Sequence, residues 1–354
     1  MQEWKKYIRQ VDPYVPGEQP KTLDVTKLNT NENPYPPSPA VEKALQEMDT
    51  DLLRRYPDPD CTVLVEALAE YYGVSKRQVF VGVGSDDVLA MAFMTFFNSD
   101  KPILFPDVSY AFYKVWAEML QIPYEMQPLR EDFHLAAEDY KKPNGGVIFP
   151  NPNAPTSIYE SLDLVEEIIA ANPDSVVIVD EAYIDFGGRS ALALLDKYEN
   201  LLVVQTFSKS RSLAGMRIGF CIGSETLIGA LNAVKYSCNY YTLNETSLRL
   251  GTASVKDDAY FKETTAKIIQ TREEAKERLT ALGFTFPEPM ANFIFASHKT
   301  IPAKELFEAM REAGIFVRYF NKPRIDNYLR ITIGTPEQME KLYRFVEDYL
   351  QRHE

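Results

Sequence analysis

Residues 201–217 read LLVVQTFSKSRSLAGMR, an apolar run that leads into a loop rich in hydroxyl side chains. Residues 201–204 have the continuous apolar character of a buried strand, so Lys209 lies a few residues beyond a strand end. Open α/β sheets place their ligand sites just beyond such strand ends. A lysine in a loop is more often a solvated surface residue, so the rest of the chain has to decide between these two interpretations.

Strand-like and helix-like segments alternate between Gln78 and Gly223. The apolar runs typical of strands span residues 78–81, 101–105, 146–149, 175–179, 201–204 and 217–223. Amphipathic or apolar helices are predicted around them, at about residues 40–48, 62–72, 88–97 and 162–171. This alternation predicts an α/β fold with a mostly parallel, doubly wound sheet in one large domain.

The pattern changes in the C-terminal part of the chain. One long charged helix is predicted from Val255 to Leu282. Short strand-like runs at residues 293–296, 315–319 and 328–333 then alternate with two amphipathic helices, predicted at residues 303–313 and 336–351. We therefore predict a second, smaller α+β domain, formed by the C-terminal part and the N-terminal arm.

The N-terminal arm is rich in proline, asparagine and tyrosine. Prolines fix the backbone and remove hydrogen-bond donors, so this arm is expected to be extended. Its tyrosines favour packing on the small domain or on a partner subunit over a disordered tail. The predicted division of the chain is an arm at residues 1–40, a large domain at 41–255 and a small domain at 256–354.

Composition excludes several classes of protein. The 354 residues have a formal net charge of −13, which argues against a broad nucleic-acid surface. The three cysteines form no CxxC pair and the three histidines are scattered, so we expect neither disulfides nor a metal site. No signal peptide and no apolar run of about 18 residues are visible, so we expect a cytoplasmic protein without a membrane partner.

Chemically distinctive side chains follow five of the predicted strands. The five groups are Gly84-Ser85-Asp86, Tyr110, Asn153, Asp180 with Tyr183, and Ser208-Lys209 with Arg217. Because strand ends of a doubly wound sheet share an edge, these groups can converge. Each group is ambiguous alone, since the loop at Gly84 could be an ordinary turn and Asp180 could cap a helix or bind a metal.

Taken together, the five groups match one ligand. Backbone amides, hydroxyls and Arg217 suit a phosphate, Tyr110 suits a flat ring, and Asp180 suits a protonated ring nitrogen. A phenolic oxygen would suit Tyr183 and Asn153, and an aldehyde would suit Lys209. Pyridoxal phosphate has all five features, so the sequence predicts it as the cofactor of the large domain.

Seven motifs give the chain a resemblance to a known family. They are Asn31-Glu32-Asn33-Pro34, Arg55-Tyr56-Pro57, Gly84-Ser85-Asp86-Asp87, Asn151-Pro152-Asn153, Asp180-Glu181-Ala182-Tyr183, Ser208-Lys209 with Leu213-Ala214-Gly215-Met216-Arg217, and Leu329-Arg330-Ile331-Thr332-Ile333-Gly334. Over essentially its whole length the chain resembles fold-type I pyridoxal-phosphate enzymes, and within them the histidinol-phosphate aminotransferases. The motifs are specific for the fold and the cofactor and less specific for the substrate.

The resemblance implies a role for each matching residue. Lys209 would form the Schiff base and move protons, Asp180 would keep the pyridine nitrogen protonated, and Tyr183 would bond the phenolic oxygen. The implied cofactor-binding residues are Ser85, Asp86, Tyr110, Asn153, Asp180, Tyr183, Thr206, Ser208, Lys209 and Arg217. Tyr56 would reach the phosphate bound to the neighbouring subunit, which implies a homodimer. The implied substrate-binding residues are Arg330, for the α-carboxylate, with Arg318, Tyr14 and Asn33.

The asparagine loop departs from the usual pattern of the family. Where that loop usually reads Asn-Asn-Pro-Thr-Gly, residues 153–157 of this chain read NAPTS. Aligned on the proline, the ring-contacting asparagine falls on Ala154. Either Asn153 takes over this contact through a small shift of the loop, or the contact is absent.

The activity that the resemblance implies is transamination between histidinol phosphate and 2-oxoglutarate, a step of histidine biosynthesis. An aminotransferase for aromatic amino acids and a related phospho-amino-acid decarboxylase remain alternatives, because all three share the cofactor site. A non-catalytic binding module is disfavoured by the presence of Lys209. The expected partners are a second copy of the chain, an amino donor and a 2-oxo acid acceptor, with no nucleic acid, membrane or metal. Whether the N-terminal arm closes over the site is left open.

Overall fold

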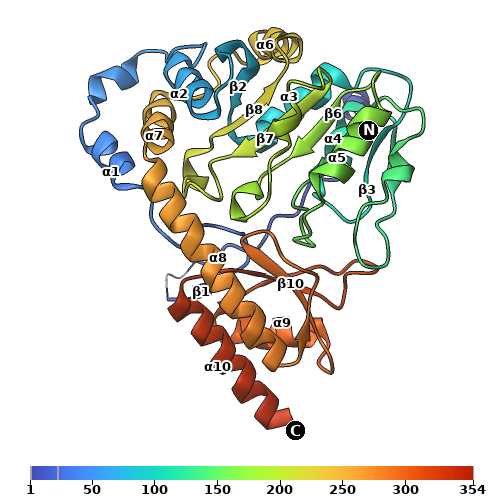
Figure 1. Ribbon diagram of the computed structural model, residues 1–354, viewed down its shortest axis with the longest axis vertical. Helices are drawn as coiled ribbons and strands as arrows, with labels where there is room; N and C mark the ends of the chain where they lie inside the picture. Colours follow the sequence, from blue (N-terminus) through green and yellow to red (C-terminus); the bar gives the residue numbers. More distant parts are fainter. Residues whose placement is uncertain (1, 22–23, 354) are drawn as a thin grey trace.

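The computed structural model describes residues 2–21 and 24–353, and its centre is a seven-stranded sheet (Figure 1). The order of its strands is β2-β8-β7-β6-β5-β3-β4. The strands are β2 (Val79–Gly82), β3 (Ile103–Pro106), β4 (Tyr124–Gln127), β5 (Gly146–Pro150), β6 (Val177–Asp180), β7 (Leu201–Thr206) and β8 (Gly219–Gly223). Only β8 runs antiparallel to its neighbours β2 and β7, so the predicted mostly parallel sheet is confirmed.

Helices cover both faces of this sheet. They are α1 (Pro39–Gln46), α2 (Thr62–Tyr72), α3 (Gly84–Phe96), α4 (Phe112–Leu120), α5 (Leu162–Ala171), α6 (Glu225–Cys238) and α7 (Glu245–Lys256). Successive residues of β6 point to opposite faces: Ile178 packs with apolar residues of α3, α4 and α6, and Val177 and Val179 pack with those of α5. Both faces of the strand are therefore buried, which explains why its sequence is a continuous apolar run.

Local signals in the sequence set the ends of two helices as predicted. Ser38 caps α1 by accepting a hydrogen bond from the backbone N–H of Val41, with Pro39 in the first turn. At the end of α2, Gly73 has a φ of +67°, in the left-handed region that favours glycine. α2 packs against α7 and against β2, the edge strand of the large sheet.

A second, four-stranded antiparallel sheet has the order β12-β13-β10-β9. Its strands are β9 (Phe284–Thr285), β10 (Phe293–His298), β12 (Arg318–Tyr319) and β13 (Leu329–Thr332), and the helices of this region are α8 (Asp258–Ala281), α9 (Ala303–Glu312) and α10 (Pro336–His353). The predicted long helix begins later than expected, because Val255 still belongs to α7 and Asp257 caps α8. Figure 1 shows α8 leading from α7 down to the small sheet, where α10 lies beside it.

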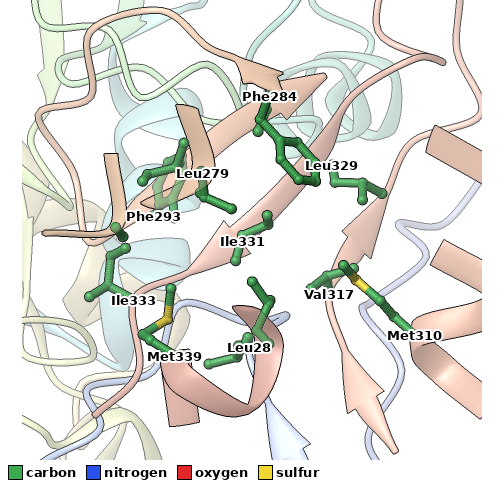
Figure 2. Packing of buried hydrophobic residues seen from close by; sticks show 14 of the residues in the cluster. Leu28, Leu279, Phe284, Phe293, Met310, Val317, Leu329, Ile331, Ile333 and Met339 are labelled. Atoms are coloured by element: carbon green, nitrogen blue, oxygen red, sulfur yellow. The ribbon is translucent and has the colours of Figure 1, made fainter. Parts of the chain in front are cut away.

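The N-terminal arm joins the small sheet region. Its strand β1 (Thr26–Lys27) pairs in parallel with β11 (Ile315–Phe316), which the sequence pattern had merged with β12 into one strand. Leu28 is completely buried and packs in one cluster with Ile331 of β13 and Met339 of α10 (Figure 2). Burying a leucine side chain contributes about 1.5–3 kcal/mol, which helps to hold this part of the arm in place. The division of the chain at residues 40 and 255 stays a prediction.

The remaining elements are short 3-10 helices. They are η1 (Glu3–Tyr7), η2 (Thr50–Arg54), η3 (Lys76–Gln78), η4 (Ala137–Tyr140), η5 (Ile184–Phe186), η6 (Ala191–Leu194) and η7 (Ala214–Met216). Across residues 2–21 and 24–353, no helix combines the length and the apolar character needed to cross a membrane. Within the same ranges, no group of three or more His, Cys, Asp and Glu side chains is placed to hold a metal ion.

Candidate active site

A cavity of about 220 Å³ lies where β5, β6 and β7 end and α3 begins. Residues predicted for the site and found in its wall are Ser85, Asp86, Tyr110, Asp180, Tyr183, Thr206, Ser208, Lys209 and Arg217. The rest of the wall is formed by Thr30, Glu32, Pro150, Ala154, Ala182 and Ala214. The edge of the sheet that the sequence singled out therefore borders a cavity.

Lys209 follows β7 and lies in the cavity wall. Its Nζ donates a hydrogen bond to the backbone oxygen of Thr30 at 3.0 Å and lies 5.9 Å from the ring centre of Tyr183. Burial, together with the nearby positive charge of Arg330, lowers the pKa of Lys209 to about 8. Roughly a tenth of the amine is therefore neutral at pH 7, far more than for an ordinary lysine, and a nucleophilic lysine requires this neutral form.

Asp180 ends β6 and is buried beside the cavity. Its Oδ2 accepts a hydrogen bond from the hydroxyl of Tyr113 at 2.8 Å, and its Oδ1 accepts one from the backbone N–H of Ala182 at 3.2 Å. Burial raises the pKa of Asp180 to about 6, because no described cation pairs with it. Such a carboxylate would be stabilised by a protonated ring nitrogen.

The first turn of α3 forms a cradle for an anion. No side chain caps this helix, so its first backbone N–H groups stay available. Gly84 has a φ of +83°, and a Cβ on it would lie 2.6 Å from Nη2 of Arg217. A Cβ on Gly219 would lie 2.2 Å from the backbone nitrogen of Ser85. These two glycines therefore allow strand β8, the helix and the guanidinium to approach closely enough to surround a phosphate.

Gly219→Ala is expected to destabilise the protein by about 2 kcal/mol or more and to weaken its binding of pyridoxal phosphate, because the added methyl group displaces the first turn of α3. Gly229→Ala is the matched control, since nothing lies within 4 Å of a Cβ built on Gly229 in α6. That control is expected to leave the free energy of unfolding unchanged or raised. Equal stability of the two variants in denaturant unfolding would contradict the close contact at Gly219.

The carboxylate of Asp86 organises the cradle. Its Oδ1 accepts a hydrogen bond from the hydroxyl of Tyr110 at 2.6 Å, and its Oδ2 lies 3.0 Å from Nη2 of Arg217. Both oxygens are thus occupied, and a phosphate would repel the carboxylate. The predicted contact of Asp86 with a phosphate is therefore best served by its backbone N–H. Its carboxylate orients Tyr110 and Arg217.

Hydroxyl groups complete the cradle opposite α3. The side chain of Thr206 donates to Oγ of Ser208 at 3.0 Å and accepts from the backbone N–H of Ser208 at 3.1 Å. Nη1 of Arg217 lies 3.5 Å from the same Oγ. Two hydroxyls, one guanidinium and a helix N-terminus together suit a phosphate dianion.

The asparagine loop places Ala154 in the cavity wall and Asn153 outside it. Nδ2 of Asn153 donates to the backbone oxygen of Val108 at 3.0 Å and to Oγ1 of Thr156 at 2.9 Å. Its Nδ2 is thus engaged with the loop and with the segment after β3, while its Oδ1 is buried without a partner among the described residues. Of the two alternatives that the sequence left open, the geometry favours the one in which no asparagine of this loop contacts the cofactor ring.

Arg330 lies next to the cavity, on β13 of the small sheet. Its Nη2 donates to the backbone oxygen of Asn29 at 2.8 Å, and its Nε is buried without a partner. Buried N–H groups of a guanidinium are rarely left unpaired, so this side chain suits the carboxylate of a substrate. Burial lowers the pKa of Arg330, but guanidinium groups stay charged in proteins.

The other predicted substrate residues do not line the cavity. Tyr14 stacks on Phe112 with ring centres 4.5 Å apart and lies 6.5 Å from the ring of Tyr110, so the arm passes beside the cavity wall. Arg318 is half-buried and donates to backbone oxygens of the arm, at Pro16 and Val15. Asn33 donates to the backbone oxygen of Ser210 at 3.1 Å, next to Lys209. Direct contact of these three side chains with a substrate stays a prediction.

Tyr56 lies outside the cavity of its own chain. Its side chain is 80% exposed and stacks on Tyr241, with ring centres 4.4 Å apart. The predicted contact with a phosphate in a neighbouring subunit is not tested by a single chain and stays a prediction.

Three residues near the lysine and the aspartate were not assigned a role from the sequence. Thr30 and Glu32 line the cavity, and Tyr113 bonds Asp180. Burial raises the pKa of Glu32, but its bonds from Lys27 and Thr30 outweigh this effect and hold it below the usual value. Glu32 belongs to a quoted motif, so the sequence located its segment. Tyr113 lies three residues after Tyr110, and this spacing was the one feature of the sequence that could have placed it near the site.

Known proteins resemble this chain over most of its length. Residues 23–346 match the family described as aminotransferase class I and II. Histidinol-phosphate aminotransferases of Acinetobacter baumannii (strain AYE) and Clostridium acetobutylicum are each 52% identical to the chain; the first alignment covers 97% of the chain and 96% of the relative, the second 96% of each. The solved structure of histidinol-phosphate aminotransferase from Sinorhizobium meliloti in complex with pyridoxal-5'-phosphate has a TM-score of 0.82 at 22% identity, covering 91% of each chain. A putative histidinol-phosphate aminotransferase from Erwinia carotovora atroseptica has a TM-score of 0.85 at 24% identity, covering 93% of this chain and 97% of that one.

Proposed function

The chain belongs to the class I and II aminotransferase family, and from this premise we propose that it transfers an amino group between histidinol phosphate and 2-oxoglutarate with pyridoxal phosphate as cofactor. Relatives that share about half of their residues with it over nearly their full length have the name histidinol-phosphate aminotransferase. The observation that supports the proposal most directly is the convergence of Lys209, Asp180 and the first turn of α3 on one cavity.

The residues present fit pyridoxal phosphate. The cradle formed by α3, Ser208 and Arg217 suits its phosphate. The carboxylate of Asp180, which has no cationic partner among the described residues, suits its ring nitrogen. Lys209 offers an amine of lowered pKa to its aldehyde. When bound, pyridoxal phosphate supplies an electron sink that stabilises negative charge at the α-carbon of the amino donor.

Lys209 is the group placed to hold and move the proton of the reaction. Its amine, with a pKa of about 8 in the cofactor-free protein, would take a proton from the substrate's α-carbon. It would then deliver this proton to the carbon that was the aldehyde of the cofactor. The backbone oxygen of Thr30 accepts a hydrogen bond from Nζ and so limits the positions that the amine can adopt. The flexible stem of lysine still allows Nζ to reach neighbouring atoms.

The other side chains bind, orient and balance charge. Tyr113 and the N–H of Ala182 hold Asp180 in one orientation, so its ionised form can face a cationic nitrogen without moving. Arg330 presents its unpaired Nε for the carboxylate of the amino acid. Tyr110, fixed by Asp86, lines the cavity with an aromatic ring that suits a planar cofactor ring.

We further propose that two copies of the chain associate in the cytoplasm. Tyr56, which is 80% exposed and stacks on the half-buried Tyr241, offers together with the 56% exposed Leu53 an apolar surface for a second copy. Light scattering coupled to gel filtration is expected to give twice the 40.4 kDa mass of the chain. A monomeric mass for an active enzyme would contradict both the association and the role of Tyr56.

The substrate is tested by comparing three amino donors on the same preparation. With 2-oxoglutarate as acceptor, kcat/KM is expected to be far higher for histidinol phosphate than for phenylalanine, and threonine phosphate is expected to release no carbon dioxide. Absence of turnover with histidinol phosphate, together with good turnover of phenylalanine, would overturn the proposed substrate. A colourless protein that takes up no pyridoxal phosphate would overturn the cofactor as well.

A further inference from the structure

Asn31 is a buried polar residue at the meeting point of three parts of the chain. Its side chain is 1% exposed, and its backbone has a φ of +58° in the left-handed region, which asparagine tolerates better than most residues. Its Nδ2 donates to the hydroxyl oxygen of Tyr183 at 2.9 Å. Its backbone N–H donates to Thr332 of β13, and its backbone oxygen accepts from Nδ2 of Asn292. The arm, the small sheet and the cavity wall are therefore joined through one residue.

The hydroxyl of Thr332 determines which end of the amide faces Tyr183. This hydroxyl accepts from the backbone N–H of Asn31 at 3.0 Å and has one hydrogen of its own, which it donates to Oδ1 of Asn31 at 3.0 Å. If the amide were reversed, that hydrogen would be buried without an acceptor among the described residues. Nδ2 of Asn31 must then be the atom that faces the phenol.

The orientation of Asn31 decides where the hydrogen of Tyr183 points. The phenol oxygen accepts from Asn31, and none of the described residues accepts a hydrogen bond from the phenol O–H. Tyr183 lines the cavity and is held edge-on against Phe293, with ring centres 5.0 Å apart. The free O–H therefore remains available to an acceptor in the cavity. No asparagine of the loop at residues 151–154 lines the cavity, so Tyr183 gains importance as a donor there.

We propose that Asn31 is a positioning residue that keeps the Tyr183 hydroxyl a hydrogen-bond donor toward the phenolic oxygen of pyridoxal phosphate. This role rests on the proposed cofactor. The amide donates to the phenol, the phenol cannot donate back, and its hydrogen is directed into the cavity. Thr332 and Asn292 hold Asn31 in place. Residues in and beside the small sheet therefore determine the direction in which the hydroxyl of Tyr183, at the large sheet, donates its hydrogen bond.

Asn31→Asp tests this role with a nearly isosteric change. The carboxylate can still accept from Thr332, but it offers an acceptor to Tyr183 in place of a donor, so the phenol hydrogen turns away from the cavity. The other ionisable groups that face Tyr183 are Arg330, Asp180, Asp86 and Lys209, and none of them is changed. The two readouts are the affinity for pyridoxal phosphate and the pH midpoint at which the visible band of the cofactor-loaded protein changes.

The affinity for pyridoxal phosphate is expected to fall about tenfold in Asn31→Asp, which is the usual effect of losing one hydrogen bond to a charged oxygen. The pH midpoint is expected to rise by about one unit. A donor from Tyr183 to the phenolic oxygen would stabilise negative charge on the bound cofactor and so lower the pH at which the cofactor-loaded site loses its proton. Without that donor the proton is held to a higher pH.

The control is the same substitution in a Tyr183→Phe background. The negative charge that Asn31→Asp introduces acts in both backgrounds, but the diverted hydrogen acts only where the phenol is present. The shift of the midpoint caused by Asn31→Asp is therefore expected to be at most half as large in Tyr183→Phe. Equal shifts in the two backgrounds would overturn the role of Asn31. A wild-type protein without a visible band would instead overturn the proposed cofactor.

Asn31→Gly supplies a second, uncharged variant that tolerates the left-handed backbone. It removes the amide donor and frees the phenol oxygen, so the cofactor affinity is expected to fall, but by less than in Asn31→Asp. Thermal unfolding of the cofactor-free variants shows whether each is folded. A folded Asn31→Gly protein with affinity lower than that of Asn31→Asp would show that Asn31 acts through packing and would overturn the proposal.

Discussion

Lys209→Ala is expected to lower kcat for the amino transfer at least about a thousandfold, since it removes the nucleophile and the proton carrier in one change. Nζ of Lys209 is the amine that faces the cavity beside the ring of Tyr183. Arg330 and Arg217 are the other cations close to Nζ, and their guanidinium groups do not lose their protons at neutral pH. The measurement is kcat at saturating cofactor and substrate, with borohydride reduction of the wild type to locate the bound cofactor at residue 209.

Lys209→Arg is the matched control for charge. It keeps a cation in the cavity but has a pKa too high to give a neutral amine, so its activity is expected to be as low as that of the alanine variant. Retention of most of the activity in Lys209→Arg would show that the positive charge matters more than the proton transfer. A reduced and labelled residue other than Lys209 would contradict the assignment of the nucleophile.

Stability gives an independent check on the state of this lysine. Its folded pKa of about 8 lies below the ordinary value of 10.5, so ionised Lys209 destabilises the fold at neutral pH. In the cofactor-free protein, the stability lost through this group is regained as the pH rises from about 8 toward 10.5. Cofactor-free Lys209→Ala is therefore expected to be at least as stable as the wild type at pH 7. A lower stability at pH 7 would contradict the burial of the charge.

Local patterns predicted most of the large sheet. The runs at residues 175–179 and 201–204 became β6 and β7 because both of their faces are buried, and such strands are continuous apolar segments. The same patterns could not give the direction of β8. Residues 207–218 connect β7 to β8 without an α-helix, and β8 returns beside β7 as an antiparallel neighbour. The separation of β11 from β12 was also missed, since two pairs of residues are too short to produce a periodicity.

The candidate site was predictable only in part. Lys209 and Asp180 were found because they lie at or just beyond a strand end, where a charged residue is conspicuous. Asn31 and Tyr113 act through other side chains, Tyr183 and Asp180, that are distant in sequence. Such contacts depend on packing between elements, and a sequence pattern describes only one element at a time. The placement of Ala154 in the cavity wall likewise required the path of the loop.

Asp180→Asn is the second change with a large expected effect. It removes the negative charge of the side chain but keeps its shape, so the two contributions can be told apart. The amide can still accept from the N–H of Ala182 and can donate to the oxygen of Tyr113, so the packing at the end of β6 is preserved. What is lost is the negative charge that would hold a ring nitrogen protonated. A ring without that proton is a weaker electron sink, so kcat is expected to fall about a hundredfold or more. Normal turnover in Asp180→Asn would refute this role.

The same substitution is expected to stabilise the cofactor-free protein. The folded pKa of Asp180, about 6, lies above the ordinary value of 3.8, so the contribution of this group to stability is present below about pH 4 and is lost as the pH rises through 6. A shift of about two units corresponds to roughly 3 kcal/mol at most. Denaturant unfolding at pH 7.5 is therefore expected to show Asp180→Asn more stable than the wild type by about 1–3 kcal/mol, with the difference shrinking toward pH 5.

Added pyridoxal phosphate is expected to reverse the order of stability of Asp180→Asn and the wild type, because only the wild type can pair a carboxylate with the cofactor's cation. A variant less stable than the wild type without cofactor would mean that Asp180 already has a cationic partner, which would remove the reason to place a ring nitrogen there.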